Sequence, residues 1–152
     1  MMSHSPEPKR AFGMRFAMLA RRWRQSLEAS LAEAGLTDAT WAPMVHLHET
    51  GGGLTQKQLA ARLGIDASTL VRLLDILERQ DLIVRRPDEH DGRARKVSLS
   101  PAGEDRVRHI RDLLWKQESL MLADLADEQI VAMMHGFEAI DRRMAGHSAG
   151  EA

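Results

Sequence analysis

The sequence predicts a mainly α-helical protein with a small β wing: a winged helix-turn-helix with further helices on both sides of it. Two observations carry this prediction. Two short helices joined by a tight turn are expected between residues 55 and 80, and two short strands follow at once, over residues 82–86 and 96–99. Longer helices with apolar stripes are expected before and after this unit. The 152 residues, of which 43% are hydrophobic, can build such a core without metals or disulfides.

The first long helix is expected over residues 12–34, after a polar tail at residues 1–10 that contains Pro6 and Pro8. Gly35 is a plausible end of this helix. Apolar residues recur in it at steps of three and four and therefore share one face. These residues are Phe12, Phe16, Leu19, Trp23, Leu27 and Leu31. We expect residues 11–35 to be a dimerisation helix.

The winged helix-turn-helix is assigned to residues 36–100. Its first helix is expected to begin at Thr37, which is a good N-cap, and to run to about Glu49. Pro43 would lie inside this helix, where it removes one backbone hydrogen bond, so a kink is expected there. The glycines at 51–53 then break the chain.

The helix-turn-helix itself begins with a capping box, in which Thr55 caps a helix and Gln58 reaches back to it. Gly64 ends this helix and Asp66 can cap the next one, which is expected over residues 67–80. On a helical wheel, Leu70, Leu73, Leu74 and Leu77 gather on one side, and Ser68, Arg72, Asp75 and Arg79 gather opposite. Short polar side chains followed by an arginine suit a helix that enters the major groove of DNA.

The two predicted strands form a hairpin whose tip contains three acidic residues followed by three basic ones, over residues 88–96. Asp91 and Arg93 can bridge across the turn and make it rigid. A guanidinium would then point outward, which suits a narrow, electronegative minor groove. An ordinary surface ion pair of little energetic value is the alternative interpretation.

The C-terminal region is predicted to contain two helices. Ser100 as N-cap and Pro101 at the first position open a helix that runs to about residue 125. The last helix is expected over residues 127–145, with a fraying start because Ala126 cannot cap it. It carries one apolar stripe, consisting of Ile130, Met133, Met134, Phe137, Ile140 and Met144. Residues 101–146 are assigned to dimerisation, and residues 147–152 to a disordered tail.

The charge distribution is uneven although the net charge is only -1. Residues 9–24 contain six basic side chains and no acidic one, whereas the chain from residue 98 onward is acidic. Basic stretches of this kind fit a nucleic-acid partner, although a solvated charged face explains each of them equally well. The absence of cysteine excludes disulfides and cysteine metal sites. No apolar run could span a membrane and no secretory signal is evident, so a cytoplasmic protein without membrane partners is expected.

Residues 91–103, which read Asp-Gly-Arg-Ala-Arg-Lys-Val-Ser-Leu-Ser-Pro-Ala-Gly, resemble the wing signature of the MarR family, with Ser100 where threonine is usual. The stretches 54–60 and 68–75 are also similar to that family, and residues 19–24 and 36–41 suggest its SlyA-like branch. The resemblance covers residues 12–145. It implies a homodimeric transcriptional regulator, most often a repressor, that binds a palindromic site on double-stranded DNA. The predicted DNA contacts are Thr55, Gln56, Ser68, Thr69, Arg72, Arg79, Asp91, Arg93, Arg95 and Lys96.

The resemblance also implies release by a small aromatic or phenolic acid, bound between the dimerisation helices and the DNA-binding module. Arg21, Arg24 and Trp41 are the candidate ligand-binding residues. Two guanidinium groups beside an indole could hold a carboxylate on an aromatic ring. The alternative is that both arginines are surface residues and that Trp41 belongs to the core.

Two other functions are alternatives to DNA binding with ligand control. A winged helix can serve as a protein- or RNA-interaction module without an operator. A small enzyme could use His46 or His48 as a base, but no nucleophile, phosphate loop or paired carboxylates accompany them. His46 and His48 are two apart and cannot share a metal ion on a helix, so no metal and no cofactor is expected.

Overall fold

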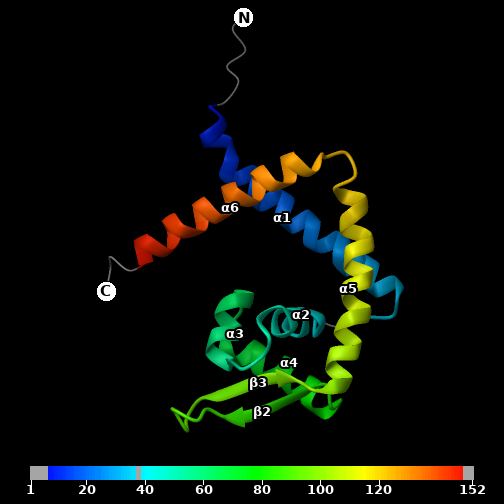
Figure 1. The fold of residues 1–152 in the computed structure, drawn as a ribbon, viewed down its shortest axis with the longest axis vertical. Helices are drawn as coiled ribbons and strands as arrows, with labels where there is room; N and C mark the ends of the chain where they lie inside the picture. Colours follow the sequence, from blue (N-terminus) through cyan, green and yellow to red (C-terminus); the bar gives the residue numbers. More distant parts are fainter. Residues whose placement is uncertain (1–6, 37–38, 149–152) are drawn as a thin grey trace, which may run out of the picture. The chain divides into compact units, whose positions relative to one another are not determined.

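The computed structural model describes residues 7–36 and 39–148. It confirms the predicted mainly α fold with a small antiparallel wing (Figure 1). The chain divides into two compact units, the first ending at Gln117 and the second beginning at Glu118. The elements are, in order, α1 (Pro8–Glu33), α2 (Trp41–Thr50), β1 (Leu54–Thr55), α3 (Gln56–Leu63), α4 (Ala67–Arg79), β2 (Ile83–Pro87), β3 (Arg95–Leu99), α5 (Pro101–Met121) and α6 (Asp127–Ser148).

The sheet has three antiparallel strands in the order β1-β3-β2. In the hairpin, Ile83 pairs with Leu99 and Pro87 with Arg95, so the turn between them points away from α5 (Figure 1). The sequence did not predict β1, which is only two residues long and pairs Leu54 with Val97. This short strand joins the base of the wing to the start of α3.

The predicted caps of α3 and α4 are confirmed. The Thr55 hydroxyl accepts a hydrogen bond from the Gln58 N–H at 3.1 Å, and the Gln58 side chain accepts one from the Thr55 N–H at 2.9 Å. Gly64 ends α3 with a φ of +65°, a left-handed conformation that glycine adopts without strain. The Asp66 carboxylate accepts the N–H of Thr69 at the start of α4. These local bonds set where α3 and α4 begin.

The core of the first unit lies between helices α1 to α4, the sheet and the first part of α5. Its most deeply buried side chains are Leu31, Met44, Leu47, Leu59, Leu70, Leu74, Leu77, Val97, Val107 and Ile110. Gly103 allows α5 to approach the chain before β2, because a Cβ at this position would lie 2.0 Å from the Leu82 carbonyl oxygen. The last glycine of the wing signature therefore has a packing role.

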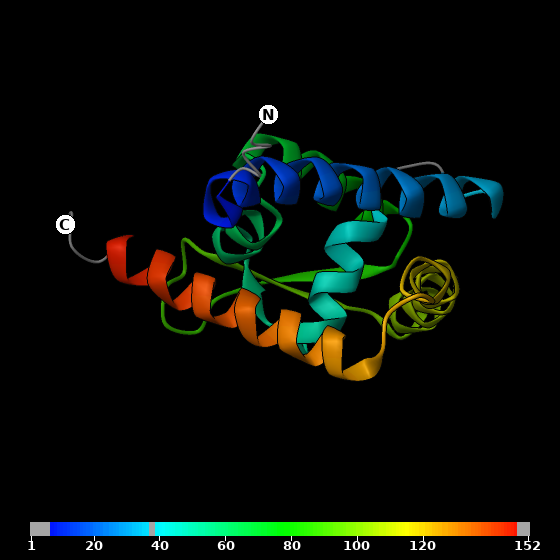
Figure 2. The same cartoon turned by 90° about the horizontal axis from the view of Figure 1, so that it is seen from above.

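The second helix differs from its prediction. Thr37, the expected N-cap, lies outside the described residues, and α2 begins at Trp41, after Thr40. Pro43 consequently occupies the first turn, where no helical hydrogen bond is lost, so the reason for the expected kink disappears. Viewed from above, α2 runs at a steep inclination to α1, while α5 is seen almost end-on (Figure 2).

The outer helices are longer than predicted. The first helix begins at Pro8, inside the predicted N-terminal tail, and the last continues to Ser148, inside the predicted C-terminal one. The remaining tail residues, 1–6 and 149–152, lie outside the described residues. Ala126 has no capping side chain, as noted, but its N–H donates to the Gln129 side chain at 2.9 Å, which completes half of a capping box. No helix among the described residues is long and apolar enough to cross a membrane.

Candidate nucleic-acid interface

The outward face of α4 has the composition that the wheel predicted. Ser68, Arg72 and Arg79 are exposed, whereas Leu70, Leu74 and Leu77 are fully buried. Thr69 is half-buried. The Thr69 N–H donates to the Asp66 carboxylate and is the main reason that the pKa of Asp66 lies below its usual range. The Ser68 hydroxyl, which donates to the same carboxylate at 2.8 Å, adds to this effect. The helix therefore presents small polar groups at its N-terminus and arginines further along.

The start of α3 contains the next two predicted contacts. Thr55 is fully engaged in the capping box, so its first role is to fix the end of the helix. Gln56 is the first residue of α3 and is half-buried. The free N–H groups of a helix N-terminus attract phosphate, which gives this end of α3 a means of contacting the DNA backbone.

The wing tip is organised by backbone hydrogen bonds. The Asp91 carboxylate accepts the backbone N–H of Arg93 at 3.0 Å rather than pairing with its guanidinium. The backbone bond from the Ala94 N–H to the Asp91 carbonyl, also 3.0 Å, closes the same turn. Asp91 thus fixes the main chain from which the exposed Arg93 side chain projects.

At the base of the tip, Asp88 has the corresponding role. Its carboxylate accepts the His90 N–H at 3.1 Å and lies 3.6 Å from the Lys96 ammonium. The His90 bond is the main reason that the pKa of Asp88 is lowered. Arg95 is exposed and Lys96 is half-exposed, so the three predicted cations, Arg93, Arg95 and Lys96, lie on and beside the turn of the wing.

Sequence reasoning missed Arg85, the best-connected charged residue of this surface. Its guanidinium donates to Asp75 at 2.6 Å and to Glu78 at 2.9 Å, both on α4. These bonds raise the pKa of Arg85 and lower that of Glu78. The strand alternation in β2, which places Arg85 on the same side as the buried Ile83, was the available signal.

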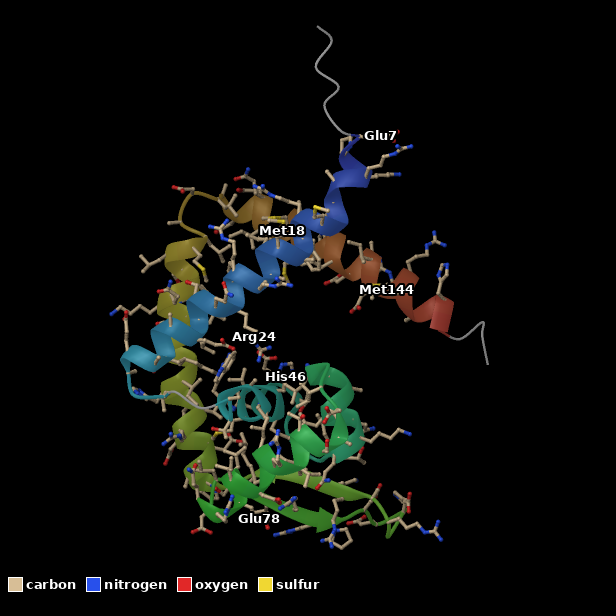
Figure 3. All side chains as sticks on the ribbon, turned by 180° about the vertical axis from the view of Figure 1, so that it is seen from behind. Glu7, Met18, Arg24, His46, Glu78 and Met144 are labelled. Carbon is tan, nitrogen blue, oxygen red and sulfur yellow. The ribbon has the colours of Figure 1, made fainter. Side chains whose placement is uncertain are left out.

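A second cluster lies between α1 and α2. The Arg24 guanidinium carbon is 5.5 Å from the centre of the Trp41 ring, a cation–π distance. Arg24 also donates to Glu28 at 3.1 Å. In Figure 3, Arg24 and His46 point toward each other from the two helices. The structure therefore brings together two of the three predicted ligand-binding residues, Arg24 and Trp41.

His46 and Arg62 extend this cluster and were not predicted as ligand-binding residues. The Arg62 Nε donates to the His46 Nδ1 at 3.3 Å, which joins α3 to α2. Burial and the nearby Arg62 lower the pKa of His46, so the neutral ring is favoured. Arg21 is exposed on α1 and is not part of the contacts described for this cluster. We call Arg24, Trp41, His46 and Arg62 the basic–aromatic cluster.

His48 contacts α5 and is not part of the basic–aromatic cluster. Because a guanidinium can only donate, Arg111 donates to the His48 Nε2 at 3.0 Å, and the Nδ1–H donates to Glu104 at 2.8 Å. These bonds connect α2 to α5. Within the described residues, no group of three His, Asp or Glu side chains could hold a metal ion. Both histidines therefore have ordinary structural partners.

Comparisons with known proteins agree with this geometry. The model of the MarR family matches residues 34–94. The transcriptional regulator PA3341 is 28% identical, with a TM-score of 0.80 over 89% of this chain and 98% of that one. A probable transcriptional regulator from Pseudomonas aeruginosa is 30% identical, with a TM-score of 0.62 over 82% of this chain and 96% of that one.

The fold is also shared with CouR from Rhodococcus jostii RHA1, a protein solved with bound p-coumaroyl-CoA. CouR is 21% identical to this chain, with a TM-score of 0.73 over 90% of this chain and 95% of CouR. At this identity the comparison concerns the fold alone.

Proposed function

Because the chain belongs to the MarR family of DNA-binding transcriptional regulators, we propose that it is a homodimeric repressor that binds a near-palindromic operator and is released by a small aromatic acid. Within the family we assign it to the SlyA-like branch, on residues 19–24 and 36–41. The observation that carries the proposal is the pairing of an outward polar face on α4 with a rigid, cationic wing on one module.

Each element of the module would contact a different part of the duplex. The start of α4 is narrow enough to enter the major groove, where Arg72 can donate two hydrogen bonds to one guanine. Ser68, Thr69 and Arg79 would contact bases or phosphates beside it. Arg93 would enter the minor groove, with Arg95 and Lys96 on the adjacent phosphates. The N-terminal end of α3, with Thr55 and Gln56, would contact the backbone.

The proposal of a dimer rests on apolar surface that one chain leaves open. On α1, Phe12 and Phe16 stack with ring centres 5.9 Å apart, yet both remain about half exposed. On α6, six large apolar side chains are more than 40% exposed: Val131, Met133, Met134, Phe137, Ile140 and Met144. Exposed apolar area of this kind marks an interaction surface, and a two-fold dimer would place two reading helices on the half-sites of a palindrome.

The basic–aromatic cluster is the proposed effector site. A carboxylate would be attracted by Arg24 and Arg62, and an aromatic ring could stack on Trp41. Because His46 joins α2 to α3, a ligand at this point would act directly on the helix that precedes α4. The bound effector would favour a dimer whose two α4 helices no longer match successive major grooves.

The DNA-binding proposal is tested with a set of operators that each carry one altered base pair. Arg72→Ala should lose about 1–3 kcal/mol of binding free energy, mostly at one base position. Arg93→Ala should weaken binding to many sequences, most strongly where the flanks are rich in A·T. Asp91→Ala should resemble a weaker Arg93→Ala, because it removes the carboxylate that accepts the backbone N–H of Arg93 and so holds Arg93 in place.

A reversed pattern would mean that the two surfaces are assigned the wrong way round: an equal loss on all operators for Arg72→Ala, and a changed base preference for Arg93→Ala. The parent protein should bind duplex DNA with a steep salt dependence. If it does not, the alternative function, a winged helix that binds protein or RNA, is favoured.

The effector proposal is tested with benzoate and with benzamide, a neutral molecule of the same shape. Benzoate should weaken operator binding and benzamide should not, because only the carboxylate can pair with Arg24 and Arg62. Arg24→Ala should blunt the response while the unliganded protein keeps its operator affinity. Arg21→Ala, on the same helix but outside the described contacts, should have the smaller effect. An unchanged response in both variants would remove the pocket from the proposal.

A further inference from the structure

The bonds of Arg85 connect the wing to the recognition helix. Arg85 lies in the middle of β2, and its two partners lie in the second half of α4, where Glu78 stands beside the hairpin (Figure 3). Only 16% of the Arg85 side chain is exposed, although Asp75 and Glu78 are about half exposed. We call these three residues the Arg85 clamp. The donors of a guanidinium form a rigid, planar fork. Bonds from this fork to two carboxylates on neighbouring turns of α4 therefore fix the orientation of β2 relative to α4.

The position of the two carboxylates gives the clamp an electrostatic role. Asp75 lies on the outward face of α4, between Arg72 and Arg79 along the helix. A free carboxylate here would face the phosphates of a bound duplex and repel them. Arg85 approaches these acids from β2 and neutralises charge on the surface that would contact DNA. Arg95 adds a weaker attraction that acts on Glu78.

We propose that Arg85 is a positioning residue for DNA recognition: it fixes the wing relative to α4 and offsets part of the negative charge of Asp75 and Glu78 next to the DNA-contacting face. This inference rests on the proposed function, in which α4 and the wing enter adjacent grooves. Both must then keep one relative placement, and the Arg85 bonds add a polar link to the short segment 80–82 and to the buried side chains of Ile83 and Val97. In this role Arg85 acts through its bonds to Asp75 and Glu78 rather than through a contact of its own with DNA.

Three variants separate the two roles of the clamp. Arg85→Gln removes both the charge and the fork. Arg85→Lys keeps the charge but loses the fork geometry. The triple variant Arg85→Gln, Asp75→Asn, Glu78→Gln removes the clamp and leaves no unpaired carboxylate. Arg108→Gln is the matched control, because Arg108 is an exposed arginine of α5 that pairs with Asp105 one turn away. Thermal unfolding of each variant shows that it is folded.

Binding to the operator and to an unrelated duplex is then measured over a range of salt concentrations. Arg85→Gln should weaken binding to both duplexes by about tenfold or more at low salt, and the Arg108→Gln control by less than about twofold. The triple variant should recover affinity for the unrelated duplex but not the preference for the operator. Arg85→Lys should behave like the triple variant, with near-normal overall affinity and a reduced preference.

A second measurement requires no DNA. The backbone ¹H–¹⁵N nuclear Overhauser effect of residues 88–94 should fall in all three clamp variants and stay unchanged in Arg108→Gln, because a detached wing moves faster. An unchanged wing, or full recovery of operator preference in the triple variant, would overturn the positioning role. Normal operator affinity in Arg85→Gln would overturn both roles. If the parent protein binds no operator, the proposed function fails, while the wing mobility still decides whether the clamp fixes the wing.

Discussion

The winged helix of residues 41–99 and the outer helices α1 and α6 differ in how their apolar residues are used. In the winged helix, Leu70, Leu74 and Leu77 of α4 are fully buried, and α3 and α4 begin at side-chain caps. In the first half of α1 and along α6, phenylalanine and methionine side chains remain between 41% and 74% exposed. One region buries most of its own large apolar side chains, and the other leaves them exposed, as the proposed dimer requires. The stability of the first should therefore be local, and that of the second should depend on assembly.

The largest effect is expected from a charge placed on the open apolar surface of α6. Phe137→Glu should dissociate the proposed dimer, because a two-fold interface contains the change twice and a central aromatic residue often contributes about 2 kcal/mol or more. Operator affinity should fall with it, by about 100-fold or more, since two half-sites are no longer bound together. Analytical ultracentrifugation and operator binding measure the two effects.

His135→Glu is the control for this change. His135 is exposed on the same helix but two residues from Phe137, so it lies on a different face. It should leave both dimer and operator binding close to those of the parent. A Phe137→Glu protein that remains a dimer at micromolar concentration would show that α6 is not the assembly surface.

The next effect compares two helical glycines. Gly103 packs closely against the winged helix, whereas the position of Gly136 in α6 has room for a side chain. Gly103→Ala should destabilise the protein by about 1–3 kcal/mol, because its Cβ would overlap the Leu82 carbonyl oxygen and the backbone must shift. Gly136→Ala has no heavy atom within 4 Å of its Cβ and should stabilise α6 by up to about 1 kcal/mol through helix propensity. Denaturant unfolding compares the two alanines directly.

An opposite result would be informative at each site. If Gly103→Ala is neutral, α5 does not approach the chain at Leu82 as closely as the structure shows. If Gly136→Ala weakens the dimer, the second copy packs its backbone against this glycine, which would place the close approach of the two chains near the middle of α6.

The sequence predicted the parts of the fold that are decided over a few residues. The capping box of Thr55, the left-handed Gly64 and the Asp66 cap all depend on neighbours within three or four positions, and all are confirmed. The start of α2 was placed too early because Thr37 satisfies the local rule for a cap, whereas the described helix begins at Trp41. A plausible cap shows where a helix can begin, and tertiary packing decides among such positions.

The candidate site was also predictable only where it depends on residues close together in the sequence. The exposed arginines of α4 and of the wing follow from helical and turn patterns. The Arg85 clamp joins residues seven and ten positions apart on different elements, and Arg62 reaches His46 across 16 positions. Such pairs depend on how strands and helices pack, and a single sequence offers only weak signals for them. Asp75 illustrates the difference, because its predicted outward position is consistent with the structure while its partner was not foreseen.

A smaller effect is expected from the capping box. Thr55→Ala removes the acceptor for the Gln58 N–H and should cost about 1 kcal/mol of unfolding free energy. Thr50→Ala is the matched control, because the Thr50 hydroxyl donates only to carbonyls of its own helix, at His46 and Leu47. That variant should change stability by less than about 0.5 kcal/mol. Equal losses in the two variants would mean that the box contributes nothing beyond a threonine-to-alanine change.

The smallest effect concerns the pH dependence of stability at His46. Burial, followed by the charge of Arg62, lowers the pKa of His46, while Glu49 opposes this change and Arg24 adds to it. The folded chain therefore binds a proton at His46 less readily than the unfolded chain does, whose histidine has a pKa of about 6.5. Unfolding free energy should rise with pH between the lowered pKa and about 6.5, and be independent of this group above that range. Protonation would also remove the acceptor for the Arg62 N–H.

His46→Gln should flatten this part of the pH profile, because glutamine keeps an acceptor and cannot titrate in this range. His109→Gln is the control, since His109 is exposed on α5 and should leave the profile unchanged. Urea unfolding at intervals from about pH 5 to 8 gives the profile, and an NMR titration of the ring protons gives the pKa itself. Benzoate should raise the measured pKa of His46 if its carboxylate binds in the basic–aromatic cluster, because a nearby anion favours the imidazolium. A pKa of His46 that benzoate leaves unchanged, in a protein whose operator binding still responds to benzoate, would place the effector elsewhere.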